Sequence, residues 1–80
     1  LEIGGGRSGM ARNLYPEAHV TTVDIDPGLA PDHAADAASE FVLGDACALP
    51  FADGSFEIVT MFDVLEHIED DRTAASEALR

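Results

Sequence analysis

LEIGGGRSG, residues 1–9, takes an apolar strand end directly into three adjacent glycines, and a helix-compatible run follows over residues 10–14. Glycine lets the backbone turn tightly and lets a ligand approach without a Cβ in the way. A helix that begins beyond such a turn offers unpaired N–H groups and a partial positive charge. The opening stretch therefore predicts a nucleotide-type pocket at a strand-to-helix turn. The alternative is a glycine-rich surface turn without a ligand.

The glycine spacing leaves two kinds of nucleotide open. Gly4, Gly6 and Gly9 fit G-x-G-x-x-G, and Asp24 supplies the acid that the dinucleotide pattern wants about 20 positions on. An NAD(P)-dependent oxidoreductase is thus one interpretation. Glu2 stands two residues before the first glycine, where a carboxylate facing the ligand would repel a pyrophosphate and attract a cation. An adenosine ligand with a positive centre and no phosphate is S-adenosylmethionine.

Four stretches together resemble the class I S-adenosylmethionine-dependent methyltransferases, most closely the small-molecule type. They occur in the family's order and spacing: LEIGGGRSG (1–9), VTTVDIDP (20–27), FVLGDACALPFADGSFEIV (41–59) and MFDVLEHIED (61–70). The chain departs from the pattern at Ser8, where the family usually has its third glycine, with Gly9 one place later. The resemblance implies a Rossmann-like, doubly wound α/β fold with a mainly parallel sheet in the strand order 3-2-1-4. Residues 1–80 would then be a partial S-adenosylmethionine-binding methyltransferase domain, truncated at both ends.

The charge balance excludes some classes of binding partner. The net charge is −12, from 16 acidic and 4 basic residues, which argues against a nucleic-acid backbone and against an anionic membrane surface. One cysteine, Cys47, excludes an internal disulfide and fits a reducing compartment. No apolar run approaches the roughly 18 residues of a membrane span, so we expect a cytoplasmic protein. The oligomeric state stays open.

Apolar periodicity predicts the order of elements. The first helix should start at Ser8 or Gly9, turn Met10, Leu14 and Tyr15 toward the sheet, and stay short because Pro16 follows. Strands are expected over residues 1–3, 19–24, 40–43 and 56–62, the last apolar enough to be covered on both faces. The remaining expectations are a loop with a short helix over 34–38, a turn at residues 53–54, a helical turn over 63–68 and a final helix from about Arg72, capped by residues 69–71.

The resemblance assigns most cofactor contacts to the strand ends. Asp24 would accept the ribose hydroxyls, and Asp45 with the backbone of Ala46 would hold the adenine edge. Glu2 and the backbone of Gly4 and Gly6 would face the methionine part. The other expected contacts are Ile3, Gly5, Ile25 and Phe62. Three alternatives stay open: Asp24 caps the following turn, Asp45 forms an Asx turn, and Phe62 belongs to the core.

Catalytic groups are less evident. His67 lies a few residues past the fourth expected strand and is a weak candidate for a general base, although packing or capping is its commoner use. Asp26, close to Asp24, is the possible misassignment of the ribose acid. Cys47 has no basic neighbour in sequence, so a nucleophilic role is not expected. The acids around His67 are too sparse to predict a metal site.

These features predict transfer of a methyl group from S-adenosylmethionine to an unidentified small-molecule acceptor by in-line displacement. Such a reaction needs the reactants held together more than it needs an acid or base. Two alternatives remain: an NAD(P)-dependent oxidoreductase and a non-catalytic remnant that only binds the cofactor.

Overall fold

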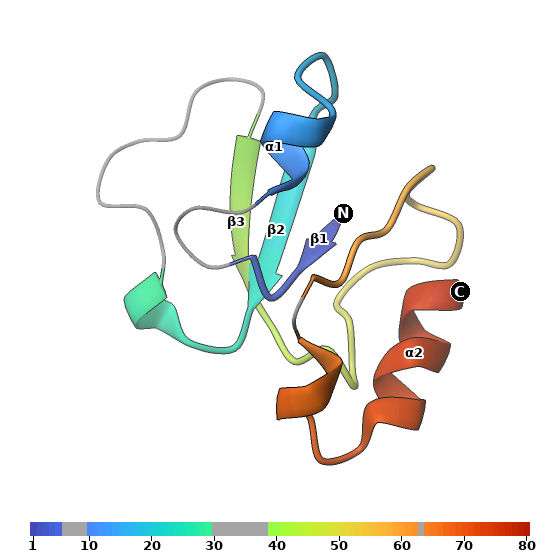
Figure 1. The fold of residues 1–80 in the computed structure, drawn as a ribbon. Coiled ribbons are helices and arrows are strands. Elements are labelled where there is room, and N and C mark those ends of the chain that lie inside the picture. The colour runs from blue at the N-terminus through green and yellow to red at the C-terminus, as the bar shows by residue number, and fades with distance from the viewer. Residues whose placement is uncertain (6–9, 30–38, 63) are drawn as a thin grey trace.

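The computed structural model describes residues 1–5, 10–29, 39–62 and 64–80 of the chain. These residues form a three-stranded parallel sheet, two α-helices and two short 3-10 helices (Figure 1). In chain order these are β1 (Glu2–Ile3), α1 (Ala11–Leu14), β2 (Val20–Asp24), η2 (Pro27–Leu29), β3 (Ser39–Leu43), η3 (Leu65–His67) and α2 (Asp71–Leu79).

The sheet has the order β1-β2-β3, with β2 in the middle and every pairing parallel. Ile3 lies opposite Val23, and Asp24 lies opposite Leu43. Because parallel strands end at the same edge, this register brings the residues after all three strands together. The parallel α/β arrangement and the neighbours 3-2-1 of the predicted order are confirmed.

The fourth predicted strand, residues 56–62, lies beside β1 as expected but forms no regular strand. Only Thr60 pairs with the sheet, in a single parallel bridge to Glu2. The N–H of Ile3 donates to the Thr60 carbonyl at 2.9 Å, and the Thr60 N–H donates to Leu1 at 2.9 Å. Strand β1 has only two residues, so it offers the neighbouring segment few backbone groups for a ladder of hydrogen bonds.

The burial predicted for that segment is also wrong. Ile58 is 47% exposed and Phe62 is 39% exposed, whereas a strand covered on both faces would hide both side chains. Val59 and Met61 do pack against the core. The segment therefore has one covered side and one open side.

Helix α1 is short, as Pro16 predicted, but its buried side is not the predicted one. Met10, Leu14 and Tyr15 are 50%, 51% and 39% exposed, and Ala11 is the buried residue. The Glu2 carboxylate accepts hydrogen bonds from the N–H groups of Met10 and Ala11, which fixes the first turn with Ala11 toward the sheet. The predicted start at Ser8 or Gly9 lies outside the described residues, as does the helix expected over 34–38.

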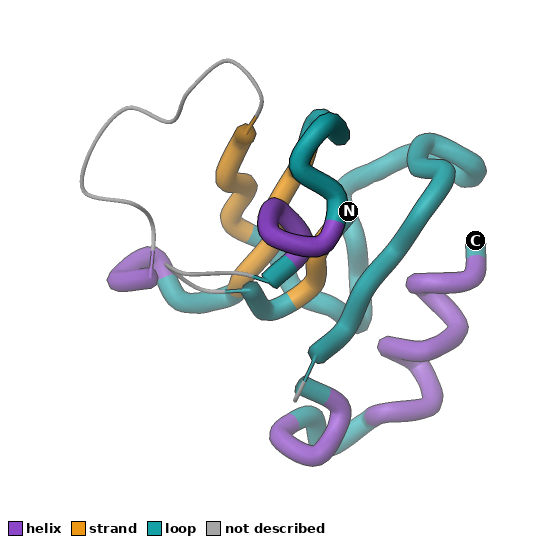
Figure 2. The backbone as a smooth tube through the Cα atoms, turned by 45° about the horizontal axis from the view of Figure 1, so that its top comes forward, coloured by secondary structure: helices purple, strands orange, loops and turns teal. Residues whose placement is uncertain are grey.

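Helix α2 begins at Asp71, one residue before its predicted start, and the predicted acidic cap is confirmed. Asp70 accepts from the Thr73 N–H at 3.1 Å and from the Thr73 hydroxyl at 2.6 Å, the pattern of an N-cap. Ala74 of this helix is fully buried. In Figures 1 and 2, α2 lies beyond the loop that follows β3, on the side of β1 away from β2.

The core lies between the sheet and α2. Its buried members are Ile3, Val23 and Leu49, one from each of β1, β2 and the loop after β3. The predicted turn at residues 53–54 is present, with Gly54 at a φ of 70°. The helical turn expected over residues 63–68 is present as η3, although Asp63 lies outside the described residues.

Candidate functional site

A cavity of about 440 Å³ opens where the three parallel strands end. That size lies within the roughly 300–1,000 Å³ usual for small-molecule sites, and strand ends of an open α/β sheet are their usual position. The lining comes from the three strand ends and from the segment around η3: Ile3, Gly4, Val23, Asp24, Ile25, Gly44, Asp45, Ala46, Val64, His67 and Ile68.

The glycine turn forms one part of this lining, and Gly4 is the residue with a conformational requirement. Its φ is +74°, a region that residues with a Cβ rarely adopt. A Cβ at Gly4 would lie 2.5 Å from Cγ2 of Val64, another residue of the lining. The prediction that Gly4 needs positive φ or an uncovered backbone is thus confirmed. Gly6, its predicted partner, lies outside the described residues.

Gly5 and Glu2 are in close contact with each other, and neither lines the cavity. A Cβ at Gly5 would lie 2.6 Å from Oε1 of Glu2, so the missing side chain leaves room for the carboxylate. Glu2 is 2% exposed, and its Oε2 accepts from the N–H groups of Met10 at 2.9 Å and Ala11 at 3.2 Å. Oε1 has no hydrogen-bond partner among the described residues. The structure therefore places Glu2 beneath the glycine turn, outside the cavity lining.

Two carboxylates stand on neighbouring strand ends. Oδ1 of Asp24 accepts from the Asp26 N–H at 3.0 Å, and Oδ1 of Asp45 accepts from the Cys47 N–H at 2.8 Å. Each therefore forms the Asx-type turn that the sequence left open as an alternative. Within the described residues the second oxygen of each carboxylate has no hydrogen-bond partner. Turn formation and ligand binding are compatible, because each uses a different oxygen.

Asp26, the possible misassignment, is separated from the site. Its Oδ1 accepts from the Gly28 N–H at 2.8 Å, its side chain is exposed, and it does not line the cavity. Asp24 is half-buried and does line it. The two acids thus share a turn geometry but differ in position.

The remaining predicted contacts divide into two groups. Ile3, Ile25 and Ala46 line the cavity, whereas Phe62 does not and is 39% exposed.

Sequence reasoning missed four lining residues: Val23, Gly44, Val64 and Ile68. Val64 and Ile68 are four residues apart, on either side of His67 in the sequence. In a helical turn this spacing places both on one side, and this pattern could have predicted them.

His67 lies in the cavity wall at the end of η3, with a side chain that is 78% exposed. Its Nε2 lies 3.6 Å from Oε1 of Glu66. Among the described residues, no group of three or more His, Cys, Asp or Glu side chains is arranged to hold a metal ion. Desolvation raises the pKa of the Cys47 thiol, and the charges of Asp45, Asp70 and Glu77 raise it further, so the thiol stays protonated and weakly nucleophilic at neutral pH.

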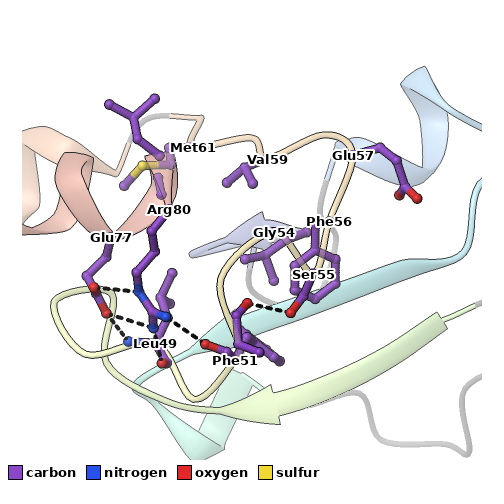
Figure 3. Close-up of a pocket in the computed structure, with 14 residues that line it drawn as sticks. Leu49, Phe51, Gly54, Ser55, Phe56, Glu57, Val59, Met61, Glu77 and Arg80 are labelled. Carbon is purple, nitrogen blue, oxygen red and sulfur yellow. Dashed lines mark hydrogen bonds and ion pairs between the residues drawn. The ribbon is translucent and has the colours of Figure 1, made fainter.

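A second, larger cavity of about 610 Å³ lies between α2 and the loop over residues 49–61 (Figure 3). It contains none of the predicted site residues. Two of its charged side chains, Glu77 and Arg80, bind each other at 2.7 Å. The cavity at the strand ends is therefore the candidate site.

No helix in the described ranges combines the length and the apolar character needed to cross a bilayer.

Comparison with known proteins identifies the fold that carries this cavity. The family described as "Methyltransferase domain" matches residues 1–80. The chain is 34% identical to an "Uncharacterized methyltransferase" of Mycolicibacterium gilvum, 33% identical to a "Demethylmenaquinone methyltransferase" of Renibacterium salmoninarum and 31% identical to the "Ubiquinone/menaquinone biosynthesis C-methyltransferase UbiE" of Dinoroseobacter shibae. Each match covers 100% of this chain and 33%, 35% and 36% of the relative, so the chain spans about a third of their length. No solved structure matches the chain significantly.

The family match extends over the whole chain, and the strand-end cavity lies where ligands bind in open α/β sheets. The chain therefore belongs to the methyltransferase domain family.

Proposed function

We propose that the protein is an S-adenosylmethionine-dependent methyltransferase that acts on a small-molecule acceptor. One observation carries the proposal beyond family membership. Asp24 and Asp45 stand at neighbouring strand ends in one cavity, each with an oxygen left over from its own turn. No Lys or Arg is among the described lining residues. Such a lining suits an adenosine with a cationic centre and disfavours a pyrophosphate.

The described residues fit the cofactor part by part. The second oxygen of Asp24 would accept from ribose hydroxyls, and the second oxygen of Asp45 would accept from the adenine amine. The N–H of Ala46, next to Asp45, would donate to a ring nitrogen. Gly4 lines the cavity at a positive φ, so its backbone is available to the methionine part. Hydrogen bonds to a charged group contribute roughly 1.5–3 kcal/mol each, enough for the two carboxylates to dominate affinity.

Glu2 has a different part in this proposal. Its carboxylate anchors the start of α1 and lies under the turn, so it fixes the backbone that the cofactor meets. A carboxylate at a helix N-terminus is favourable because the local dipole is positive. We therefore assign Glu2 to the shape of the turn, with any effect on the cofactor's ammonium group acting at longer range.

The cofactor supplies the chemistry when bound, since its sulfonium carries the activated methyl group. The chain's own residues hold and orient the reactants, an effect that can contribute on the order of 7–11 kcal/mol of the barrier. Ile3, Val64 and Ile68 give the cavity apolar lining on both the strand side and the η3 side. His67 is the one described imidazole in the lining and remains the candidate to accept a proton from an acceptor.

The acceptor is proposed by class. One relative is named a demethylmenaquinone methyltransferase, and another is named a ubiquinone/menaquinone biosynthesis C-methyltransferase. A demethylmenaquinone is therefore the first acceptor to test, and a panel of phenolic and amine acceptors is the comparison. Because the chain spans a third of those relatives, acceptor contacts are not assigned to any residue here.

Isothermal titration of the full-length protein tests the cofactor. We expect micromolar or tighter binding of S-adenosylhomocysteine and no measurable binding of NAD⁺ or NADP⁺. Tight NAD⁺ binding with indifference to S-adenosylhomocysteine would favour the oxidoreductase alternative. Transfer of a radiolabelled methyl group to an acceptor then separates an enzyme from a remnant that binds but does not react.

A further inference from the structure

The turn that carries Asp45 and Ala46 into the cavity is a closed unit. The Ala48 N–H donates to the Asp45 carbonyl at 3.0 Å, and these two residues form an isolated antiparallel bridge. Inside it, the Cys47 N–H donates to the Asp45 carboxylate at 2.8 Å. A unit of this kind moves as one body, so its position depends on how its two ends are held.

The first end is held by the sheet. Gly44, directly before the turn, donates its N–H to the Asp24 carbonyl at 2.9 Å. A Cβ at Gly44 would lie 2.9 Å from Cγ2 of Val23, so the backbone there is in close contact with β2. This end is therefore tied to the strand that also carries Asp24.

The second end is held by α2, although α2 contributes no residue to the cavity lining. Leu49 is 8% exposed, and both of its backbone polar groups bind the helix. Its N–H donates to Oε1 of Glu77 at 2.7 Å, and its carbonyl accepts from Nη2 of Arg80 at 2.7 Å (Figure 3). A third contact is made by the Cys47 thiol, which lies 3.4 Å from the Asp70 carbonyl.

Glu77 and Arg80 also hold each other in place. Nε of Arg80 donates to Oε2 of Glu77 at 2.7 Å, while Nη1 binds the Phe51 carbonyl at 2.8 Å. The hydrogen bonds from Arg80 and Leu49 lower the pKa of Glu77, so its carboxylate is ionised at neutral pH. The Arg80 guanidinium also binds Oδ1 of Asp53 at 2.7 Å, so its planar fork serves two carboxylates and two carbonyls, a pattern that lysine cannot reproduce.

We propose that Glu77 and Arg80 are positioning residues for the adenine-facing edge of the cofactor site, acting through Leu49 on the turn over residues 45–48. This inference rests on the proposed function, because it takes Asp45 and Ala46 to read the base. It makes recognition of the base, rather than chemistry at the methyl group, the property that depends on α2.

The test compares two ligands that differ only in the base. S-adenosylhomocysteine carries an amine that Asp45 can accept from, and S-inosylhomocysteine carries a carbonyl there instead. In the full-length wild-type protein we expect a preference of about tenfold or more for the adenosine ligand, the size of one charged hydrogen bond. Glu77→Ala should reduce that preference by about threefold or more, and Glu77→Gln, which can still accept from Leu49, should retain most of it.

The matched control is Glu69→Gln, which removes the same charge as Glu77→Gln. Glu69 is exposed and makes no hydrogen bond in the described part of the chain. Its substitution should leave the preference at the wild-type value. Arg80→Lys keeps the charge but loses the fork, so it should behave like Glu77→Ala and gives the same reading if Glu77→Ala fails to fold.

A second readout needs no ligand. Amide hydrogen exchange at Ala48 should accelerate in Glu77→Ala and Arg80→Lys, because its bond to Asp45 lies inside the unit that α2 holds. An unchanged preference in a folded Arg80→Lys or Glu77→Ala protein would overturn the inference. A wild-type protein that binds both ligands equally would overturn it too, whereas a wild-type protein that binds neither would contradict the proposed function itself.

Discussion

The cavity at the strand ends has two walls of different origin. The strand wall consists of Gly4, Asp24 and Asp45, which lie at or within two residues of the ends of β1, β2 and β3. The helix wall consists of Val64, His67 and Ile68, around η3. The strand wall carries the carboxylates and the bare backbone, whereas the helix wall is mainly apolar. The strand wall should therefore set the affinity and specificity of ligand binding. The helix wall should set the shape of the cavity and the exclusion of water from it.

The difference lies in how each wall is positioned. Register in a parallel sheet fixes where every strand ends, so Asp24 and Asp45 meet as a consequence of backbone hydrogen bonding. The helix wall is positioned by packing, chiefly by Val64 against the glycine turn and the core. Substitutions in the first wall should remove specific contacts, and substitutions in the second should change volume.

The largest effect is expected where the two walls touch. Gly4→Val would place a Cβ at a φ of +74° and 2.5 Å from Val64, so the residue is strained and the walls are forced apart. We expect a loss of about 100-fold or more in cofactor affinity, with a fall of about 1–3 kcal/mol in the free energy of unfolding. Titration with S-adenosylhomocysteine and denaturant unfolding measure the two quantities.

Gly54→Val is the matched control for Gly4→Val. Gly54 has a φ of +70°, almost the same backbone conformation, but a Cβ there would meet nothing within 4 Å. It lies outside the strand-end cavity. This variant should lose only the stability that backbone strain costs, less than Gly4→Val loses, and it should keep wild-type affinity. Equal loss of affinity in both variants would mean that strain in general, rather than contact between the walls, governs binding.

The next largest effect tests the strand wall alone. Asp24→Ala should weaken cofactor binding by about tenfold or more, because it removes the carboxylate oxygen that the turn leaves over. Asp26→Ala is its control, since Asp26 forms the same kind of turn without lining the cavity. If both substitutions weakened binding equally, the turn rather than the ribose contact would be responsible.

The strand wall could be predicted from the sequence because each of its members lies at or close after the end of a predicted strand. Gly4 and Asp24 followed from the glycine pattern and the strand ends, whereas Asp45 was implied by the family resemblance. The helix wall could not, because apolar residues in VLEHI fit the core and the cavity equally well. Glu2 was predicted on the correct strand, but its hydrogen bonds to the start of α1 were not predicted, since nothing in the sequence says which side of a turn a buried carboxylate takes.

The segment over residues 56–62 shows a second limit of sequence patterns. Its apolar run is typical of a covered strand, and its neighbour β1 was correctly predicted. A strand also needs a partner of matching length, and β1 provides two residues. Composition records how apolar a segment is, whereas the number of ladder hydrogen bonds is a property of the assembled sheet.

A smaller effect is expected in the helix wall. Ile68 is half-buried and contributes volume, so Ile68→Ala should weaken cofactor binding by about threefold to tenfold through lost apolar contact.

His67→Ala should change binding by less than about threefold, because the side chain is 78% exposed. A large loss of turnover in His67→Ala at unchanged affinity would assign His67 a proton-transfer role. A loss of affinity in Ile68→Ala as large as in Asp24→Ala would contradict the division between the walls.

The smallest effect concerns α2, which lies behind both walls. Hydrogen bonds from the Thr73 side chain and N–H lower the pKa of Asp70, and those from Arg80 and Leu49 lower that of Glu77. A carboxylate whose pKa is depressed in the folded state stabilises the fold above its ordinary value, here 3.8 and 4.5, and loses that contribution as the pH falls through the lowered pKa. Asp70→Ala and Glu77→Gln should therefore lower Tm at neutral pH, and the difference in Tm from the wild type should shrink below about pH 4.

Thermal melts of the full-length protein across that pH range measure this difference. Ser76→Ala, an exposed and non-titrating change in the same helix, should give a Tm difference that does not vary with pH. If the Asp70 and Glu77 gaps were equally flat, the two carboxylates would act on α2 through packing or helix propensity, and their charge would not be what holds the helix behind the cofactor site.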